Sequence, residues 1–169
     1  RDFRFKKRVW FLQTGTSICA GCARGCNIFV DHSEGKIYRF RPRENQEVNR
    51  YWLCDKGRLS YNANNAADRV VAPMVYVQHR PIHVSWQKAV SEAKTLIEQT
   101  NKEEIVGVLS ATATQEENQA FYELFLNVLG LSQICYSGLD IDYNFGDDFL
   151  KKSDRNPNLQ GVRKFSQQR

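Results

Sequence analysis

Long apolar runs are missing from this sequence of 169 residues. No stretch approaches the roughly 18 consecutive apolar residues that a membrane-spanning helix needs. The basic opening at residues 1–8 is not followed by the apolar segment of a secretory signal peptide. There is also no initiator methionine, so we expect an internal piece of a longer protein. Glycine-rich phosphate loops of the form G-x-G-x-x-G are absent, and no nicotinamide or flavin site is expected on this chain.

Positive charge is concentrated in the first third of the chain. The whole sequence carries 24 Lys and Arg against 19 Asp and Glu, a net charge of +5. Residues 1–58 hold 13 basic and 6 acidic residues, a net of +7, whereas residues 59–169 hold 11 and 13, a net of -2. A basic segment of this kind indicates either a nucleic-acid partner or cations that surround an anionic cofactor.

Four of the five cysteines lie inside that basic segment, spaced C-x2-C-x3-C-x27-C as Cys19, Cys22, Cys26 and Cys54. An odd total argues against a disulfide framework, because three thiols within eight residues cannot all pair with one distant cysteine. Structural zinc sites usually take two separated pairs of ligands. Three close cysteines and a remote fourth are instead typical of a 4Fe–4S cluster. We expect these four cysteines to be the metal ligands of one 4Fe–4S cluster, with zinc as the alternative.

Small and basic residues accompany these cysteines. Gly21 and Gly25 stand just before two of them, where a backbone without Cβ bends sharply and turns N–H groups towards sulfur. Four thiolates around a cubane leave a net negative charge, which nearby cations offset. The cations expected to do so are Arg24, Lys56 and Arg58, although each is also interpretable as a solvated surface residue.

Local patterns predict a small β-rich cluster-binding domain over residues 1–61. Residues 8–13 are expected to form a strand that leads into the cysteine loop. Residues 27–32 and 36–41 alternate apolar and polar side chains around Ser-Glu-Gly, which predicts a β-hairpin with an imperfect register. The hairpin would return the chain towards Cys54, and a bound cluster would stabilise a segment with little core of its own.

The cysteine blocks I-C-A-G-C-A-R-G-C-N-I-F-V-D-H and R-P-R-E-N-Q-E-V-N-R-Y-W-L-C-D-K-G-R resemble the cluster-binding domain of the molybdopterin oxidoreductase family. Within that family, D-F-R-F-K with V-W-F-L, and the later D-D-F-L and N-P-N, are similar to the large iron–sulfur subunits (75 kDa type) of bacterial NADH–quinone oxidoreductase, respiratory complex I. Formate dehydrogenases and nitrate reductases of the same family share the four-cysteine pattern and a lysine at the position of Lys56.

The resemblance implies electron transfer through the cluster as part of NADH:quinone oxidoreductase. Its partners would be other subunits of a respiratory complex, peripheral to the membrane on the cytoplasmic side of the bacterial inner membrane. It implies no quinone site and no direct nucleic-acid contact on this chain, which alone is not expected to be catalytic. One alternative is the cluster domain of a molybdopterin enzyme, in which Lys56 would bridge cluster and pterin. Another is a zinc-stabilised nucleic-acid-binding module.

The second half of the sequence predicts the start of a parallel α/β sheet, so the fold class is α+β with an α/β part. Residues 62–84 are expected to be an extended linker, residues 85–150 a partial α/β domain and residues 151–169 a polar tail that frays or docks on a neighbouring subunit. The elements expected in the α/β part are a helix over 86–98 capped by Ser85, a strand over 105–109, a helix from the capping box at 114–117 to Leu129, which Gly130 ends, and a strand over 134–136.

Other residues are weaker candidates for chemistry. His79 and His83 have helical spacing, but the intervening proline favours surface or turn histidines over a metal pair. Cys135 lies in an apolar stretch and is expected to be a buried small hydrophobe. Residues 138–148 are rich in aspartate but lack the spacing of a calcium loop, which favours a solvated acidic loop.

Overall fold

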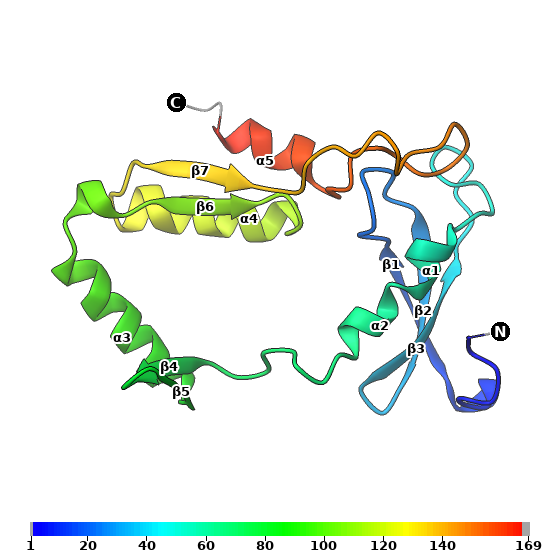
Figure 1. Ribbon diagram of the computed structural model, residues 1–169, viewed down its shortest axis with the longest axis horizontal. Helices are drawn as coiled ribbons and strands as arrows, with labels where there is room; N and C mark the ends of the chain where they lie inside the picture. Colours follow the sequence, from blue (N-terminus) through cyan, green and yellow to red (C-terminus); the bar gives the residue numbers. More distant parts are fainter. Residues whose placement is uncertain (1, 167–169) are drawn as a thin grey trace.

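The computed structural model describes residues 2–166, and its elements gather in two lobes (Figure 1). The cysteine lobe consists of a short 3-10 turn, three strands and two short helices: η1 (Val9–Phe11), β1 (Gln13–Ile18), β2 (Asn27–Ser33), β3 (Lys36–Pro42), α1 (Asp55–Leu59) and α2 (Tyr61–Asn64). The α/β lobe contains β6 (Gly107–Ser110), α4 (Gln115–Glu123), the π-helical turn η3 (Leu124–Val128), β7 (Ile134–Ser137) and α5 (Leu159–Ser166). No helix within residues 2–166 has the length and apolar character needed to span a membrane.

The sheet of the cysteine lobe is antiparallel, in the order β1-β2-β3. The predicted hairpin is confirmed, and Glu34 and Gly35 form its two-residue turn with φ of 52° and 73°, as the favoured hairpin turn requires. The imperfect register has its source in an irregularity between Asp31 and His32. The apolar face of the sheet packs on the cysteine loop and the short helices, in a core that contains Cys19, Cys26, Ile28, Phe40, Leu53, Tyr61 and Leu150.

The strand expected over residues 8–13 is wrong, because the chain turns through η1 and enters β1 only at Gln13. The register explains the difference. Gln13 already pairs with His32, close to the hairpin turn, so β2 offers no backbone partner to the residues before it. Trp10 and Phe11 remain 70% and 59% exposed, and their apolar character reflects no burial within residues 2–166.

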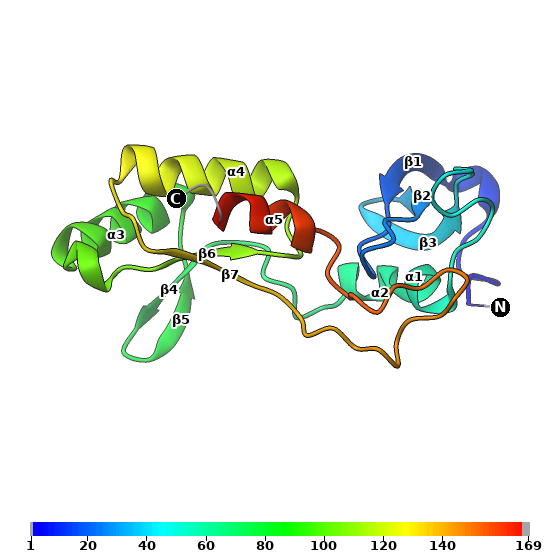
Figure 2. The ribbon, with the colours of Figure 1, turned by 90° about the horizontal axis from the view of Figure 1, so that it is seen from above.

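The α/β lobe is built on a parallel β-α-β unit, as the sequence predicts. β6 and β7 pair in parallel, with Gly107 opposite Ile134. The capping box is present, because the Thr114 side chain accepts from the Glu117 backbone while the Glu117 side chain accepts from the Thr114 backbone. Gly130 follows the helical run with a φ of 64°. Helices α4 and α5 cover the same face of the two strands (Figure 2).

The expectation of a fraying or docking polar tail is wrong for its described part, because residues 159–166 form α5. Leu159, Val162 and Phe165 are buried against the core of this lobe, which includes Leu109 and Phe125. The three apolar residues recur at spacings of three along a polar segment, a weak helical signal that becomes clear only when the core is known. Residues 167–169 lie outside the described part of the chain.

The opposite face of the two-stranded sheet has no cover within residues 2–166, and this corrects the expectation for Cys135. Successive side chains of a strand point to opposite faces, so Ile134 faces the helices while Cys135 faces away beside Val108. Cys135 is therefore exposed and not a buried hydrophobe.

The segment between the lobes has more structure than an extended linker. It contains α2 and a hairpin of β4 (Met74–Val77) and β5 (Arg80–His83), turned by Gln78 and His79 at positive φ. Both histidines are exposed, which agrees with surface or turn positions. Helix α3 (Trp86–Gln99) follows with the predicted Ser85 cap, yet Val90 and Leu96 on its apolar face are more than 60% exposed. Figure 1 shows the hairpin and α3 apart from both sheets.

Candidate metal centre

The four cysteines of the basic segment line one cavity in the cysteine lobe. Cys19, Cys22 and Cys26 come from the loop between β1 and β2 and are 6%, 7% and 4% exposed, whereas Cys54 precedes α1 and is half-buried. The structure therefore brings together residues that the sequence separates by up to 35 positions. Cys135, the fifth cysteine, lies in the other lobe and is not part of this cavity.

Backbone hydrogen bonds close the cysteine loop on itself. The Cys19 N–H donates to the Cys26 carbonyl at 2.8 Å, and the Gly25 N–H donates to the Cys22 carbonyl at 3.4 Å. Gly25 has a φ of 65°, a conformation that a residue with a side chain rarely adopts. The sharp bend expected at this glycine is thus observed, and it turns the chain so that three thiols share one cavity.

Cys54 enters the cavity from the start of α1. Its Sγ caps the helix by accepting the Gly57 N–H at 3.3 Å. Gly57 lies so close to the thiols that a Cβ at this position would stand 3.0 Å from Cys19 Sγ and 3.4 Å from Cys54 Sγ. The first turn of α1 therefore passes between two of the four sulfur atoms, and only a glycine leaves the space between them open.

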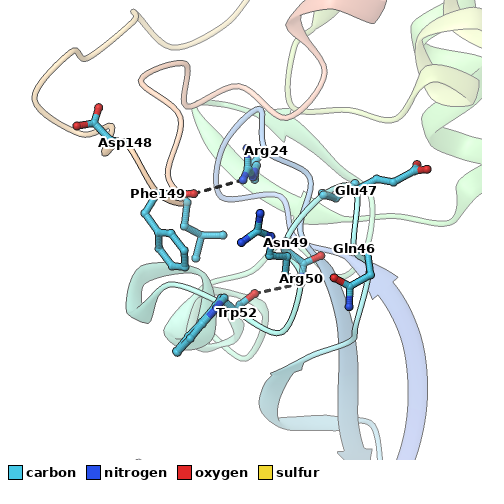
Figure 3. A pocket seen from close by; sticks show the side chains of 10 residues that line it. Arg24, Gln46, Glu47, Asn49, Arg50, Trp52, Asp148 and Phe149 are labelled. Atoms are coloured by element: carbon cyan, nitrogen blue, oxygen red, sulfur yellow. Dashed lines mark hydrogen bonds between the residues drawn. The ribbon is translucent and has the colours of Figure 1, made fainter.

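Of the three cations expected near the ligands, the structure brings two to the site. Lys56 lines the cavity itself. Arg24 donates to the Phe149 carbonyl at 3.3 Å, and its charge acts to lower the pKa of Cys26 (Figure 3). Arg58 does not line the cavity and instead donates to the Leu53 carbonyl at 3.4 Å and lies 4.0 Å from Asp55.

A distant stretch of chain completes the site, and sequence reasoning missed it. We call residues 142–155 the cover segment; Figure 1 shows it, in orange, reaching from β7 to the cysteine lobe before the chain returns to α5. Three of its residues line the cavity: Phe145, Leu150 and Lys151. Leu150 is 7% exposed and belongs to the core of the cysteine lobe.

The cover segment is attached directly to the cysteine loop and to the stretch before Cys54. The Ala23 N–H donates to the Asp154 carbonyl at 2.9 Å. Phe149 packs edge-on against Trp52 with the ring centroids 5.7 Å apart, and its carbonyl accepts from Arg24 (Figure 3). The expected solvated acidic loop is therefore incomplete as an account of residues 138–148, because their C-terminal part packs over the cysteines.

The cavity disfavours free thiolates. Burial raises the pKa of the Cys19 thiol. Burial, assisted by the neighbouring thiols Cys19, Cys22 and Cys54, raises the pKa of Cys26 to about 11. Four thiols in such a place ionise when a positively charged group takes the protons' place, because metal binding and thiol deprotonation are linked. The donor set is therefore suited to a cationic metal group.

The donor set fits an iron–sulfur cluster in number, type and spacing. Four cysteine sulfurs are the usual ligands of a 4Fe–4S cluster, one for each iron. Among the described residues, no three His, Cys, Asp or Glu side chains are arranged to hold a single metal ion. A cluster is larger than one ion, so its ligands stand further apart than sulfurs that each lie about 2.3 Å from one zinc.

Comparisons with known proteins agree with this description of the site. Residues 12–65 match the family described as molybdopterin oxidoreductase Fe4S4 domain. These residues include all four cysteines of the cavity, together with Arg24, Lys56 and Arg58.

Similarity to curated proteins extends further along the chain. It is 33% identical over 121 residues to NADH-quinone oxidoreductase subunit 3 of Thermus thermophilus, covering 72% of this chain and 15% of that protein. It is 38% identical over 117 residues to a subunit of the NADH-quinone oxidoreductase of Pseudomonas fluorescens, covering 69% and 12%. The subunit of the same name from Escherichia coli K12 is 35% identical over 117 residues, covering 69% and 13%.

The matched part thus spans no more than 15% of the length of these three relatives. The family match and the relatives agree with the resemblance that the two cysteine blocks carry, and they extend it beyond those blocks. Residues 12–65 of this chain belong to the molybdopterin oxidoreductase Fe4S4 domain family.

Proposed function

We propose that Cys19, Cys22, Cys26 and Cys54 hold one 4Fe–4S cluster. The convergence of four buried or half-buried thiols on one cavity, with Gly57 between two of the sulfurs, carries this assignment. The cluster supplies one-electron transfer. The chain's own residues bind it through the four thiolates, donate the Gly57 N–H to one sulfur and place the Lys56 ammonium at the cavity.

The proposed role in the cell is electron transfer within an NADH:quinone oxidoreductase complex. The names of the relatives support this role, because all three are subunits of NADH-quinone oxidoreductase. The partners would be other subunits of the complex, which would lie peripherally on the cytoplasmic side of the bacterial inner membrane. The chain alone would be a relay without a catalytic site, since hydride chemistry requires a nicotinamide and a two-electron cofactor.

The domain organisation follows from the same proposal. Residues 1–61 would be the cluster-binding domain, and the parallel β6-α4-β7 unit would begin a molybdopterin-oxidoreductase-like α/β domain within residues 85–150. The exposed face of this unit at Val108 and Cys135 supports the idea of a larger sheet, because parallel sheets are generally covered on both faces.

A second candidate function is the cluster domain of a molybdopterin enzyme. One observation favours it: Lys56 lines the cysteine cavity, where a cation would stand between a cluster and a second redox group. In such an enzyme Lys56→Ala would abolish turnover while the cluster stays, and the parent protein would contain molybdenum or tungsten. In a complex I subunit, the same substitution would only lower the reduction potential modestly, since one compensating cation is lost.

The test is metal content and spectroscopy on anaerobically purified protein. We expect a brown protein with about four irons per chain and an EPR signal that develops on strong reduction. Cys54→Ser should make the cluster labile. Cys135→Ser is the matched control and should leave iron content unchanged, because this thiol is exposed in the other lobe. Stoichiometric zinc without iron, or equal behaviour of the two variants, would refute the assignment.

A further inference from the structure

The cover segment contributes three side chains to the cluster cavity, although it follows Cys54 by roughly 90 residues and lies outside the matched domain at residues 12–65. Phe145 is half-buried at the cavity, Leu150 is 7% exposed in the core, and Lys151 is half-buried beside them. These residues come from the loop between β7 and α5, so the family pattern of four cysteines does not include them.

Phe145 stands between two lysine side chains at the cavity. The Lys56 Nζ lies 4.5 Å from the centroid of the Phe145 ring, and the Lys151 Nζ lies 5.4 Å from it. An ammonium group within about 6 Å of a ring centroid is attracted by the negative face of the ring. One aromatic side chain therefore links a lysine next to Cys54 with a lysine from the cover segment.

The turn that presents these side chains is organised by Asp147. Its Oδ1 accepts the backbone N–H groups of Phe149, Leu150 and Lys151 at 3.1, 2.5 and 2.9 Å. These bonds, that from Leu150 first, lower the pKa of Asp147. The other oxygen, Oδ2, lies 3.6 Å from the Lys151 Nζ. The turn is thus fixed from within, and it places Leu150 inward and Lys151 at the cavity.

We infer that the cover segment tunes the cluster: Phe145 and Leu150 keep water from it, and Lys151 supplies a second cation beside Lys56. This inference rests on the proposed cluster function. Reduction adds a negative charge to the cluster, which water and nearby cations stabilise. Removal of the apolar cover therefore raises the reduction potential, whereas removal of the lysine lowers it. The two substitutions act in opposite directions although the residues stand six positions apart.

The experiment compares reduction potentials, followed by EPR, and rates of iron release to a chelator in the full chain. Phe145→Ala is expected to raise the potential and to speed iron release several-fold, because the cavity opens to water. Lys151→Met is expected to lower the potential with little change in iron release. Phe145→Leu keeps an apolar cover and should return iron release close to the wild-type rate.

Phe149→Ala is the matched control, since Phe149 lies in the same segment but packs against Trp52 and does not line the cavity. It should leave the potential unchanged. Equal shifts for Phe149→Ala and Phe145→Ala, or shifts of the same sign for Phe145→Ala and Lys151→Met, would overturn the inference.

A second readout covers variants that lose the cluster during purification. In the metal-free protein, iodoacetamide should modify the thiols of the cavity several-fold faster in Phe145→Ala than in wild type, with Cys135 as the internal reference. Equal rates would overturn the inference. A wild-type protein without iron would instead refute the cluster assignment, so the two failures are distinguishable.

Discussion

Arg41 binds both carboxylate oxygens of Asp31 in the centre of the antiparallel sheet. The Arg41 Nε lies 2.7 Å from Oδ2 and its Nη2 lies 2.9 Å from Oδ1. Arg39 donates to Oδ2 at 2.5 Å, and the Thr14 hydroxyl donates to Oδ1 at 2.8 Å. Asp31 on β2, which is 1% exposed, thereby joins β1 and β3 through side chains as well as through backbone pairing.

We expect Asp31→Asn to lower the free energy of unfolding by about 2–3 kcal/mol. Breaking a buried ion pair by removing one partner costs about 3–5 kcal/mol, and the partial exposure of the two arginines places this site at or below the lower end of that range. Urea unfolding followed by tryptophan fluorescence measures the change. Glu34→Gln is the control, because the Glu34 pair with Lys7 is largely exposed and should be worth less than about 1 kcal/mol. Equal losses for both variants would contradict the prediction.

The same pair gives a pH dependence with a defined sign. Burial raises the pKa of Asp31, but hydrogen bonds from Arg41, Arg39 and Thr14 outweigh burial and hold the pKa well below its usual range. Such a group stabilises the fold above its unfolded pKa, and this contribution disappears as the pH falls towards the native pKa. The difference in unfolding free energy between wild type and Asp31→Asn should be constant from about pH 8 to 5 and shrink below about pH 4. A difference that grows on acidification would be inconsistent with this sign.

Gly57→Ala should reduce iron content although alanine favours helix by about 1 kcal/mol over glycine. The added methyl group would stand 3.0 Å from Cys19 Sγ and 3.1 Å from Leu53 Cδ1, so it crowds a ligand sulfur and its neighbour in the core. Iron per chain and the visible absorption of the cluster measure the effect. Gly15→Ala in β1 is the control, because nothing lies within 4 Å of its added Cβ. A Gly57→Ala protein with full iron would show that the cavity tolerates the methyl group.

Helix α5 should contribute measurably to the stability of the α/β lobe. Val162 is fully buried, and Val162→Ala is expected to cost about 2 kcal/mol, the sum of lost burial at about 0.8 kcal/mol per methylene and a residual cavity. Gln160→Ala on the exposed side of the same helix should change stability by less than about 0.5 kcal/mol. Thermal unfolding distinguishes the two, and equal values would indicate that α5 does not pack in solution.

Elements with local signals could be predicted from the sequence. The hairpin around Glu34 and Gly35, the Ser85 and Thr114 caps and the stop at Gly130 all depend on residues within one turn of each other. The four cysteines could be grouped because ligand spacing reflects the size of the metal group. Each of these predictions needed only chemistry that acts over a few residues.

Features that depend on distant partners could not be predicted. Residues 8–13 look apolar enough for a strand, but only the register with β2 shows that no partner exists there. Cys135 lies in an apolar stretch, and which face of β7 is covered decides its exposure. Phe145 and Leu150 stand in a segment rich in aspartate, and nothing local indicates that they reach the cysteines.

Buried asparagines are the other feature that the sequence conceals. Four of them bind backbone groups from both the carbonyl and the amide end of the side chain, as a neighbouring strand would: Asn49 at Asn27, Arg43 and Trp52; Asn65 at Ile37; Asn118 at Ser110; and Asn156 at Leu139. A polar residue in a polar stretch gives no sign of this role, since its partners lie up to 28 positions away.

The position of the cover segment also imposes an order on biosynthesis. The last proposed ligand, Cys54, emerges from the ribosome roughly 90 residues before Phe145, which at about 5–20 residues per second is an interval of about 5–20 s. During that interval the nascent cysteine lobe has all four thiols but no lid over them. Insertion of a cluster is easiest in this open state, and the arrival of Leu150 then closes the entrance behind it. A chain that leaves the ribosome without its cluster would have to reopen the cover to receive one.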